Sequence, residues 1–148
     1  MLAMTPDDLT DFLHREIPLT AAMGARVLRS GDGEIEISAP LALNFNLHGT
    51  AFGGSLAALG LICGWVVLYR ALGDAGLKAQ LVAQKSECNF IAPATQELRG
   101  AAQLPADEWA RFVATLRQKG RARLSVITEI HAGETLAVTH IGTYAAKL

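Results

Sequence analysis

The feature that most constrains this chain is a stretch without charged side chains, residues 51–69, which has the length and composition of a long helix. About 20 such residues would cross a bilayer. However, four glycines interrupt the stretch, no second segment resembles it, and no block of Lys or Arg precedes it. A helix that is apolar all round is otherwise buried on every side. We therefore expect a soluble protein, with no membrane partner, in which a sheet wraps around this helix.

A short polar loop, residues 44–52, leads into the predicted helix. It carries Asn46 and His48, and it is followed by Gly53 and Gly54, which present bare backbone N–H groups where the helix begins. The first N–H groups of a helix have no internal partners, and the macrodipole adds partial positive charge there. Such a helix start favours a phosphate or a developing oxyanion.

Length, composition and charge narrow the class of protein. The 148 residues fit one domain, 1–148. A formal net charge of −1 argues against a nucleic-acid partner, and a hydrophobic content of 51% argues against disorder. The acidic, helix-like opening differs from a secretory signal, so we expect a cytoplasmic protein. Cys63 and Cys88 have neither zinc-site nor redox-pair spacing, and the four scattered His predict no metal site.

The pattern of apolar residues predicts an α+β fold. Thr5 followed by Pro6 is typical of a helix start, and Pro18 is expected to end that helix. A second helix is expected between Pro105 and Gly120. Strands are expected at residues 23–28, 34–39, 77–91, 96–104, 121–131 and 135–144, several with the alternation of a sheet that has one wet face. The result is an antiparallel sheet of about six strands around one long helix.

This order of elements resembles the hotdog fold of acyl-thioester enzymes. Residues 46–54, NLHGTAFGG, are similar to the Asn-x-x-Gly-x-x-His-Gly-Gly signature of the phenylacetate-type thioesterases, with Phe52 where that group has its second His. Residues 49–56, GTAFGGSL, and the later Gly64-Trp65 resemble more closely a thioesterase-like family that also occurs fused to acetyltransferases. That family includes malonyl-acyl carrier protein decarboxylases.

The resemblance implies an assembly and a substrate carrier. It implies a homodimer or a tetramer whose sheets join edge to edge and whose active sites lie at the subunit interface. A pantetheine arm, carried by acyl carrier protein or coenzyme A, would thread between subunits and place its thioester beside the helix start. No other cofactor is expected, and the implied setting is fatty acid biosynthesis.

Thioester hydrolysis in this fold usually depends on a carboxylate that activates water or attacks the carbonyl. The position of that acid in the phenylacetate-type enzymes is occupied by Leu61 here, and no Asp or Glu occurs between Glu36 and Asp74. Glu87 could be brought in from the following strand, although a charged strand residue is more often on the solvated face.

Decarboxylation of a malonyl thioester needs no base, because the barrier is set by the enolate oxygen that forms as carbon dioxide leaves. The amide of Asn46 and the backbone N–H of Gly54 are suited to hold that oxygen. His48 is a candidate to return the proton to the carbanion. A loop without carboxylates avoids repulsion of the substrate carboxylate, and apolar surroundings favour its loss. We therefore expect an enzyme that converts malonyl-acyl carrier protein to the acetyl form.

Other residues of the loop and of a basic run are expected to contact the substrate or its carrier. The substrate contacts are expected from Thr50, Phe52, Gly53 and Ser55. Arg121 and Arg123 could dock an acidic carrier protein or the phosphates of coenzyme A, and they would share a strand face with Lys119 if the strand begins that early. A solvated helix end is the structural alternative for this basic run.

Structural roles and other functions stay open at this point. Asn46 is equally suited to a turn, a lone loop His is more often a structural hydrogen-bonder, and close packing would require Gly53 and Gly54 whatever the activity. One alternative function is an acyl-thioester hydrolase that uses Glu87 or a water held by Asn46 and His48. Another is a dimer that binds acyl groups without catalysis.

Overall fold

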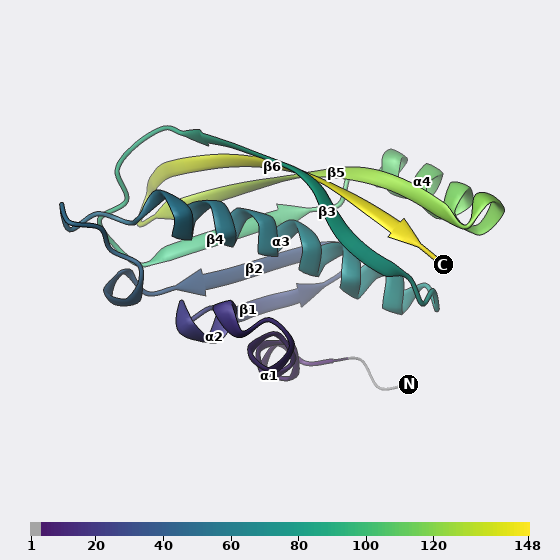
Figure 1. Ribbon diagram of the computed structural model, residues 1–148, viewed down its shortest axis with the longest axis horizontal. Helices are drawn as coiled ribbons and strands as arrows, with labels where there is room; N and C mark the ends of the chain where they lie inside the picture. Colours follow the sequence, from purple (N-terminus) through teal and green to yellow (C-terminus); the bar gives the residue numbers. More distant parts are fainter. Residues whose placement is uncertain (1–3) are drawn as a thin grey trace.

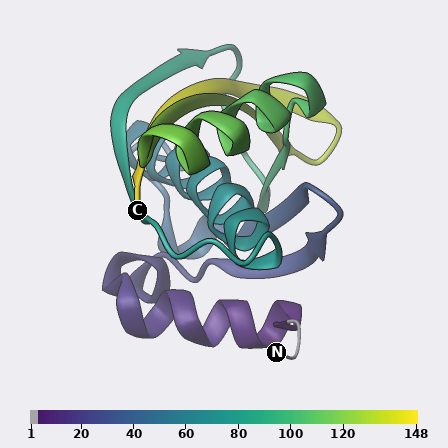
Figure 2. The same cartoon turned by 90° about the vertical axis from the view of Figure 1, so that its right-hand side faces the viewer.

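The computed structural model of the protein describes residues 4–148 and shows the predicted α+β architecture. Its elements are α1 (Pro6–Glu16), α2 (Pro18–Ala22), β1 (Arg26–Gly31), β2 (Glu34–Ala39), a 3-10 turn (Leu41–Leu43), α3 (Gly53–Asp74), β3 (Gln80–Phe90), β4 (Leu98–Gln103), α4 (Ala106–Lys119), β5 (Arg121–Ala132) and β6 (Thr135–Lys147). The strands form one antiparallel six-stranded sheet in the order β1-β2-β4-β5-β6-β3. The sheet wraps around α3, which is the arrangement of the hotdog fold (Figures 1 and 2).

Helix α3 is the core of the fold. It has 22 residues, and by length and composition alone it could cross a membrane. In the structure the sheet curls around it, and α1 packs beside β1, with the Phe12 ring of α1 stacked on the Tyr69 ring of α3 (Figure 2). Leu59, Val66 and Leu68 of the helix are fully buried against this surrounding layer. The membrane-like composition of α3 is therefore that of a core helix.

Two glycines let strand β6 approach α3 closely. A methyl group at Gly60 would lie 2.6 Å from the ring of His140, and one at Gly64 would overlap the hydroxyl of Tyr144. That hydroxyl also donates a hydrogen bond to the backbone carbonyl of Leu61 (2.7 Å). The close approach that the glycine spacing predicts is thus made by a strand of the same chain.

The N-terminal segment differs from the prediction in one respect. Thr5 caps α1 as predicted, because its hydroxyl accepts from the N–H of Asp8 (3.1 Å) and the Asp8 carboxylate accepts from the N–H of Thr5 (3.0 Å). Pro18 does more than end this helix, since it is the first residue of α2. Proline fits the first turn of a helix, where its missing N–H would have no partner. The first strand consequently begins at Arg26 and not at residue 23.

The basic run is divided between α4 and β5. Gly120 adopts a φ of 73°, in the left-handed region, and ends α4. Lys119 is therefore the last residue of the helix, and β5 begins only at Arg121, so the condition under which Lys119 would share a strand face with Arg121 and Arg123 is not met. Arg121 and Arg123 do lie together on the exposed face of β5. Strands β5 and β6 form the predicted hairpin.

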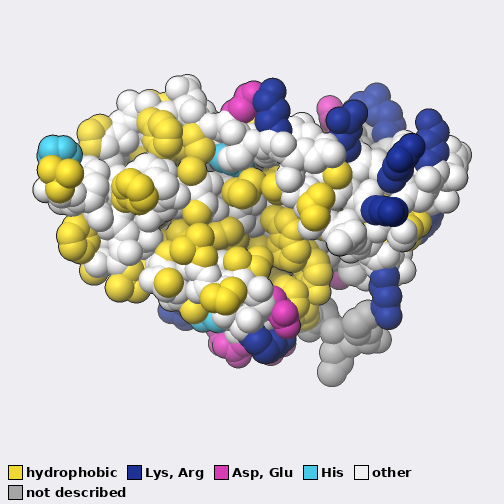
Figure 3. Space-filling model, viewed as in Figure 1, with side chains coloured by type: hydrophobic (Ala, Val, Ile, Leu, Met, Phe, Trp, Pro, Cys, Tyr) yellow, Lys and Arg dark blue, Asp and Glu magenta, His cyan; other side chains and the backbone are white. Residues whose placement is uncertain are grey.

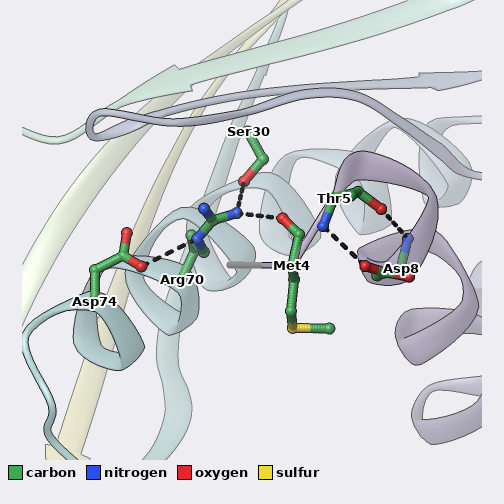
Figure 4. Close-up of polar contacts among 6 residues, drawn as sticks. All are labelled: Met4, Thr5, Asp8, Ser30, Arg70 and Asp74. Carbon is green, nitrogen blue, oxygen red and sulfur yellow. Dashed lines mark hydrogen bonds and ion pairs between the residues drawn. The ribbon is translucent and has the colours of Figure 1, made fainter. Parts of the chain in front are cut away.

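Arg70 ties the far end of α3 to the N-terminal part of the chain (Figure 4). Its guanidinium donates to the carbonyl of Met4 (2.9 Å) and to the hydroxyl of Ser30 (3.3 Å), and it pairs with Asp74 (3.3 Å). The Arg70 side chain is only 15% exposed, so solvent screens these contacts less than it would on an open surface. The C-terminal end of α3 is thereby fixed to β1 and to the segment before α1.

We predict opposite effects for an added methyl group at two glycines of α3. Gly64→Ala forces a methyl group into the Tyr144 hydroxyl, and overpacking of this kind lowers the free energy of unfolding by about 1–3 kcal/mol. Gly73→Ala is the matched control, because nothing lies within 4 Å of its new methyl group. Alanine in a helix should there raise the free energy of unfolding by up to about 1 kcal/mol. Urea unfolding measures both, and equal effects would contradict the packing described.

Candidate active site

Asn44 fixes the loop that leads into α3. Its side chain is buried, and its amide nitrogen donates to the carbonyls of Met23 (2.9 Å) and Pro40 (2.8 Å). Its own backbone carbonyl accepts from the N–H of Phe52 (2.7 Å). The two ends of the loop are therefore held together by one satisfied, buried asparagine, a role that the sequence analysis did not assign.

Asn46 organises the loop from within. Its amide nitrogen donates to the Thr50 hydroxyl (2.9 Å) and, at 3.5 Å, to the carbonyl of Ala51. Its side-chain oxygen accepts from the N–H groups of His48 (2.8 Å) and Thr50 (3.3 Å). This is the turn-forming role that asparagine often has in loops. The predicted catalytic role stays a prediction, and it requires the long contact to Ala51 to be exchanged for a substrate oxygen.

The start of α3 is open at its N–H groups. Phe52 is the N-cap residue, and no side chain caps this helix within residues 4–148. Packing requires glycine at position 54, because the Phe52 ring occupies the space that a methyl group there would fill. A methyl group at Gly53 would make an ordinary contact with the Phe90 ring at 3.6 Å. The helix start combines two aromatic rings with uncapped N–H groups, which carry partial positive charge.

A cavity of about 320 Å³ lies beside this helix start. It is lined by Leu19, Ala22, Met23, Leu43, Asn44, Phe52, Gly54, Ser55 and Ala58. In the part of the chain that the structure describes, no charged side chain contributes to this lining. A larger cavity of about 560 Å³ lies on the outer face of the sheet beside α4, away from the helix start. We assign the site to the smaller cavity, because there the first N–H groups of α3 meet an apolar wall that could hold an acyl group.

The structure brings together only part of the predicted site. Phe52, Gly54 and Ser55 line the cavity, whereas His48 is on the exposed tip of the loop. Arg121 and Arg123 lie at the far end of the sheet within one chain. The loop is bonded to Ala94, four residues before Leu98, which pairs with the last residue of β5, and the 12 residues of β5 span roughly 35 Å. Within residues 4–148, no three His, Cys, Asp or Glu are grouped as metal ligands.

Glu87 does not reach the helix start of its own chain. It pairs in register with Ile141, which is exposed on the outer face of the sheet, and side chains opposite one another share a face. It forms an ion pair with Lys85 at 2.7 Å, and this contact lowers the pKa of the Glu87 carboxyl. The idea that the fold brings Glu87 into this site as a base is therefore wrong for a single chain, because alternation along β3 turns the carboxylate outward.

His140 and Ser86 form a polar pair that the sequence analysis missed. His140 is fully buried in β6, and its Nε2 lies 2.7 Å from the hydroxyl of Ser86 on β3. Its Nδ1 has no hydrogen-bond partner among the described residues. Burial lowers the pKa of this imidazole. The only signal in the sequence is a His at a core-facing position of an alternating strand, and its partner is 54 residues away.

The fold and the site together define a class of protein, the hotdog-fold proteins of acyl-thioester chemistry. Residues 6–148 match the family described as "Putative thioesterase (yiiD_Cterm)", and the chain belongs to this family. A putative thioesterase from Shewanella oneidensis is 24% identical with a TM-score of 0.83, and 97% of each chain is covered. A protein of unknown function from Chlorobaculum tepidum TLS is 25% identical with a TM-score of 0.88, covering 98% of each chain. A thioesterase from Haemophilus influenzae is 15% identical with a TM-score of 0.75, covering 99% of this chain and 94% of that one.

We predict that stability falls in acid because of His140. Burial lowers its pKa in the folded state, so the unfolded chain binds more protons as the pH falls through about 6.5. Its contribution is complete above that pH and is lost as the pH falls toward the lowered pKa. The free energy of unfolding in urea should therefore be smaller at about pH 5.5 than at about pH 7.5, a window above the range of ordinary carboxyl groups. His140→Gln should reduce this difference, and an unchanged difference would contradict the assignment.

Proposed function

We propose that this protein decarboxylates a malonyl thioester, converting malonyl-acyl carrier protein to the acetyl form. The observation that carries the proposal is the start of α3, where, among the described residues, no side chain caps the N–H groups and no charged side chain lines the adjoining cavity. Such a site offers stabilisation to a forming oxyanion and no repulsion to the substrate carboxylate. The pantetheine arm of the substrate is the only carrier group that this reaction requires.

In the proposed reaction the negative charge moves from the substrate carboxylate to an enolate oxygen. The bond between the carboxylate carbon and the α-carbon breaks, carbon dioxide leaves, and the electron pair moves into the thioester to form an enolate. The N–H groups of Gly53 and Gly54 and the amide of Asn46 would bind the enolate oxygen. The apolar wall disfavours the localised carboxylate more than the delocalised enolate. The α-carbon then takes one proton, for which the exposed His48 or solvent is the proposed source.

Hydrolysis is the second candidate function. The family is described as thioesterases, and the relative from Haemophilus influenzae is named one. In this chain hydrolysis would have to proceed without Glu87, because that carboxylate is on the outer face and paired with Lys85. This is why we place decarboxylation first.

We propose that the working form is a homodimer or a tetramer. The only strand paired with β3 among the described residues is β6, so the other edge of β3 is open. Its side chains include Val82 and Phe90, which are 49% and 56% exposed. Ala58, Leu61 and Trp65 add a half-buried strip on α3, and the face over α3 shows a broad hydrophobic region (Figure 3). An open, apolar edge strand favours pairing with a second copy.

We propose that Arg121 and Arg123 contact the carrier, which is a cytoplasmic acyl carrier protein or coenzyme A. Lys and Arg gather at the end of the molecule where α4 lies (Figure 3). Both arginines are exposed, and Arg123 lines the larger cavity. Because both arginines are far from the helix start of their own chain, we propose that they contact the carrier whose acyl group is bound at the helix start of the partner copy. A surface of this sign would attract acidic residues or phosphates.

A product assay separates the candidate functions. Malonyl and acetyl thioesters of acyl carrier protein and of coenzyme A are incubated with the protein, and carbon dioxide and free thiol are both measured. We predict carbon dioxide with an intact thioester. Asn46→Ala should lower this rate by about 10²-fold, the typical cost of one oxyanion donor.

The matched control for this assay is Asn89→Ala, which removes an exposed amide from β3 and should leave the rate unchanged. Free thiol without carbon dioxide would instead establish hydrolysis. Binding without either product would establish the acyl-binding alternative.

A further inference from the structure

Burial of the polar His140 imidazole is unfavourable in free energy, and its hydrogen bonds do not fully offset this. A methyl group at Gly60 would lie 2.6 Å from the imidazole ring, so α3 gives up a side chain to admit it. The Nδ1 atom has no partner among the described residues, although a buried polar nitrogen is normally satisfied. An apolar residue at this position would leave no buried polar nitrogen without a partner. The one interaction that His140 makes with a side chain in this structure is its 2.7 Å contact with Ser86.

The groups that face the imidazole carry no charge. Cys88 of β3 and Thr128 of β5 are paired in register with His140 and share its face of the sheet. Thr128 itself donates to the carbonyl of Gly60 (3.3 Å). Burial without a carboxylate disfavours the imidazolium, and it lowers the pKa of His140. The pair is therefore neutral, and His140 is poorly suited to take a proton from Ser86 and make it a nucleophile.

A neutral imidazole leaves the Ser86 hydroxyl free to act outward. If Nε2 carries the proton, it donates to the Ser86 oxygen, and the hydroxyl proton points away from His140. Because Nδ1 has no partner within residues 4–148, no hydrogen bond from these residues to that end of the ring fixes the other tautomer. Ser86 is exposed on the edge strand and faces the α3 side of the sheet. It can therefore offer a polarised hydrogen bond to a ligand.

Strand β3 forms a wall along α3 that runs back to the helix start. The Phe90 ring lies 3.6 Å from the position of a methyl group on Gly53, and the indole N–H of Trp65 donates to the carbonyl of Leu81 (2.9 Å). The strand thus runs antiparallel to the helix. Gly60 is six residues after Gly54, which corresponds to about 9 Å along the helix. A flexible chain that reaches the helix start and lies along α3 would pass Ser86.

We propose that Ser86 donates a hydrogen bond to an oxygen of an acyl thioester bound along α3, and that His140 is the positioning residue that turns this hydroxyl outward. The acceptor is a carboxylate oxygen of the acyl group or a carbonyl oxygen of the thioester and its pantetheine arm. This contact rests on the proposed acyl-thioester function, and it holds for decarboxylation and for hydrolysis alike.

The test uses the stable amide analogues of malonyl-pantetheine and acetyl-pantetheine, in which nitrogen replaces the thioester sulfur. Their affinities are measured by calorimetry for the wild type and for Ser86→Ala, Ser86→Thr and Thr143→Ala. Thr143 is the matched control, because its hydroxyl also bonds a side chain of a neighbouring strand, Ser125 (2.9 Å), on the outer face. In parallel, the ¹⁵N resonances of the His140 ring report which nitrogen carries the proton.

We expect Ser86→Ala to weaken binding about tenfold, the order expected for one hydrogen bond, while Ser86→Thr and Thr143→Ala bind like the wild type. If Ser86→Ala weakens the binding of the malonyl analogue alone, the acceptor is the carboxylate. If it weakens the binding of both analogues equally, the acceptor is a carbonyl that both share. The His140 resonances should move toward the Nε2-protonated form when the analogue binds. Wild-type affinity in Ser86→Ala, or an acyl group found covalently on Ser86 by mass spectrometry, would overturn the proposal.

The proposed function can fail separately. A wild-type protein that binds the analogues through Ser86 but releases neither carbon dioxide nor thiol from the true thioesters overturns the enzymatic function and leaves this contact standing. If the protein turns over malonyl thioester and Ser86→Ala behaves like the wild type, the Ser86 contact is overturned and the enzymatic function stands. A protein that binds neither analogue overturns the contact as well.

Discussion

The structure depends on burying a 22-residue helix, uncharged up to Tyr69, inside a sheet of six strands. The hydrophobic effect favours this burial at roughly 25 cal/mol per Å² of apolar surface, but only if strands can approach the helix backbone. Gly60 and Gly64 permit that approach on the β6 side, where His140 and Tyr144 occupy the space. The helix is also fixed at its far end by Arg70, which bonds to the chain near α1 and β1. These contacts leave the beginning of the helix as its accessible end.

The chemical character of the site follows from this burial. The buried part of α3, up to Tyr69, carries no carboxylate, and among the described residues the cavity beside its first N–H groups has no charged lining. Buried Asn44 closes the loop that precedes it, and Asn46 shapes the loop tip through four contacts within residues 46–51. The Ser86–His140 pair continues this neutral character along α3, because burial keeps the imidazole uncharged. Partial charges and hydroxyl groups, and not ionised side chains, are therefore the means by which this protein can stabilise a negative oxygen.

Local patterns in the sequence predicted the fold well. Alternation along residues 121–131 and 135–144 identified the last hairpin, and the glycine spacing in residues 51–69 identified a helix packed closely against a neighbour. The proline at position 18 misled the prediction, because proline both ends one helix and fits the first turn of another. Lys119 belongs to the helix and not to the strand, since the helix continues until Gly120 can adopt a left-handed conformation.

The site was less predictable than the fold, because its contacts join distant residues. Ser86 and His140 are 54 positions apart, and only the register of β3 against β6 brings them together. The outward orientation of Glu87 depends on the same register and could not be deduced from composition. Even Asn46, which the motif singled out, has a structural role that only the hydrogen bonds within its loop reveal.

The central claim is that the cavity at the start of α3 must be free of acidic side chains for the proposed decarboxylation of a malonyl thioester. Ala58 lines that cavity, so Ala58→Asp places a carboxylate there and Ala58→Asn places an uncharged group of nearly the same shape. The most direct measurement is the rate of carbon dioxide release from malonyl thioester by the two variants. The account predicts that the asparagine variant releases carbon dioxide about 10²-fold faster than the aspartate variant, as for the loss of one electrostatic contact to the oxyanion. Equal rates in the two variants would contradict it.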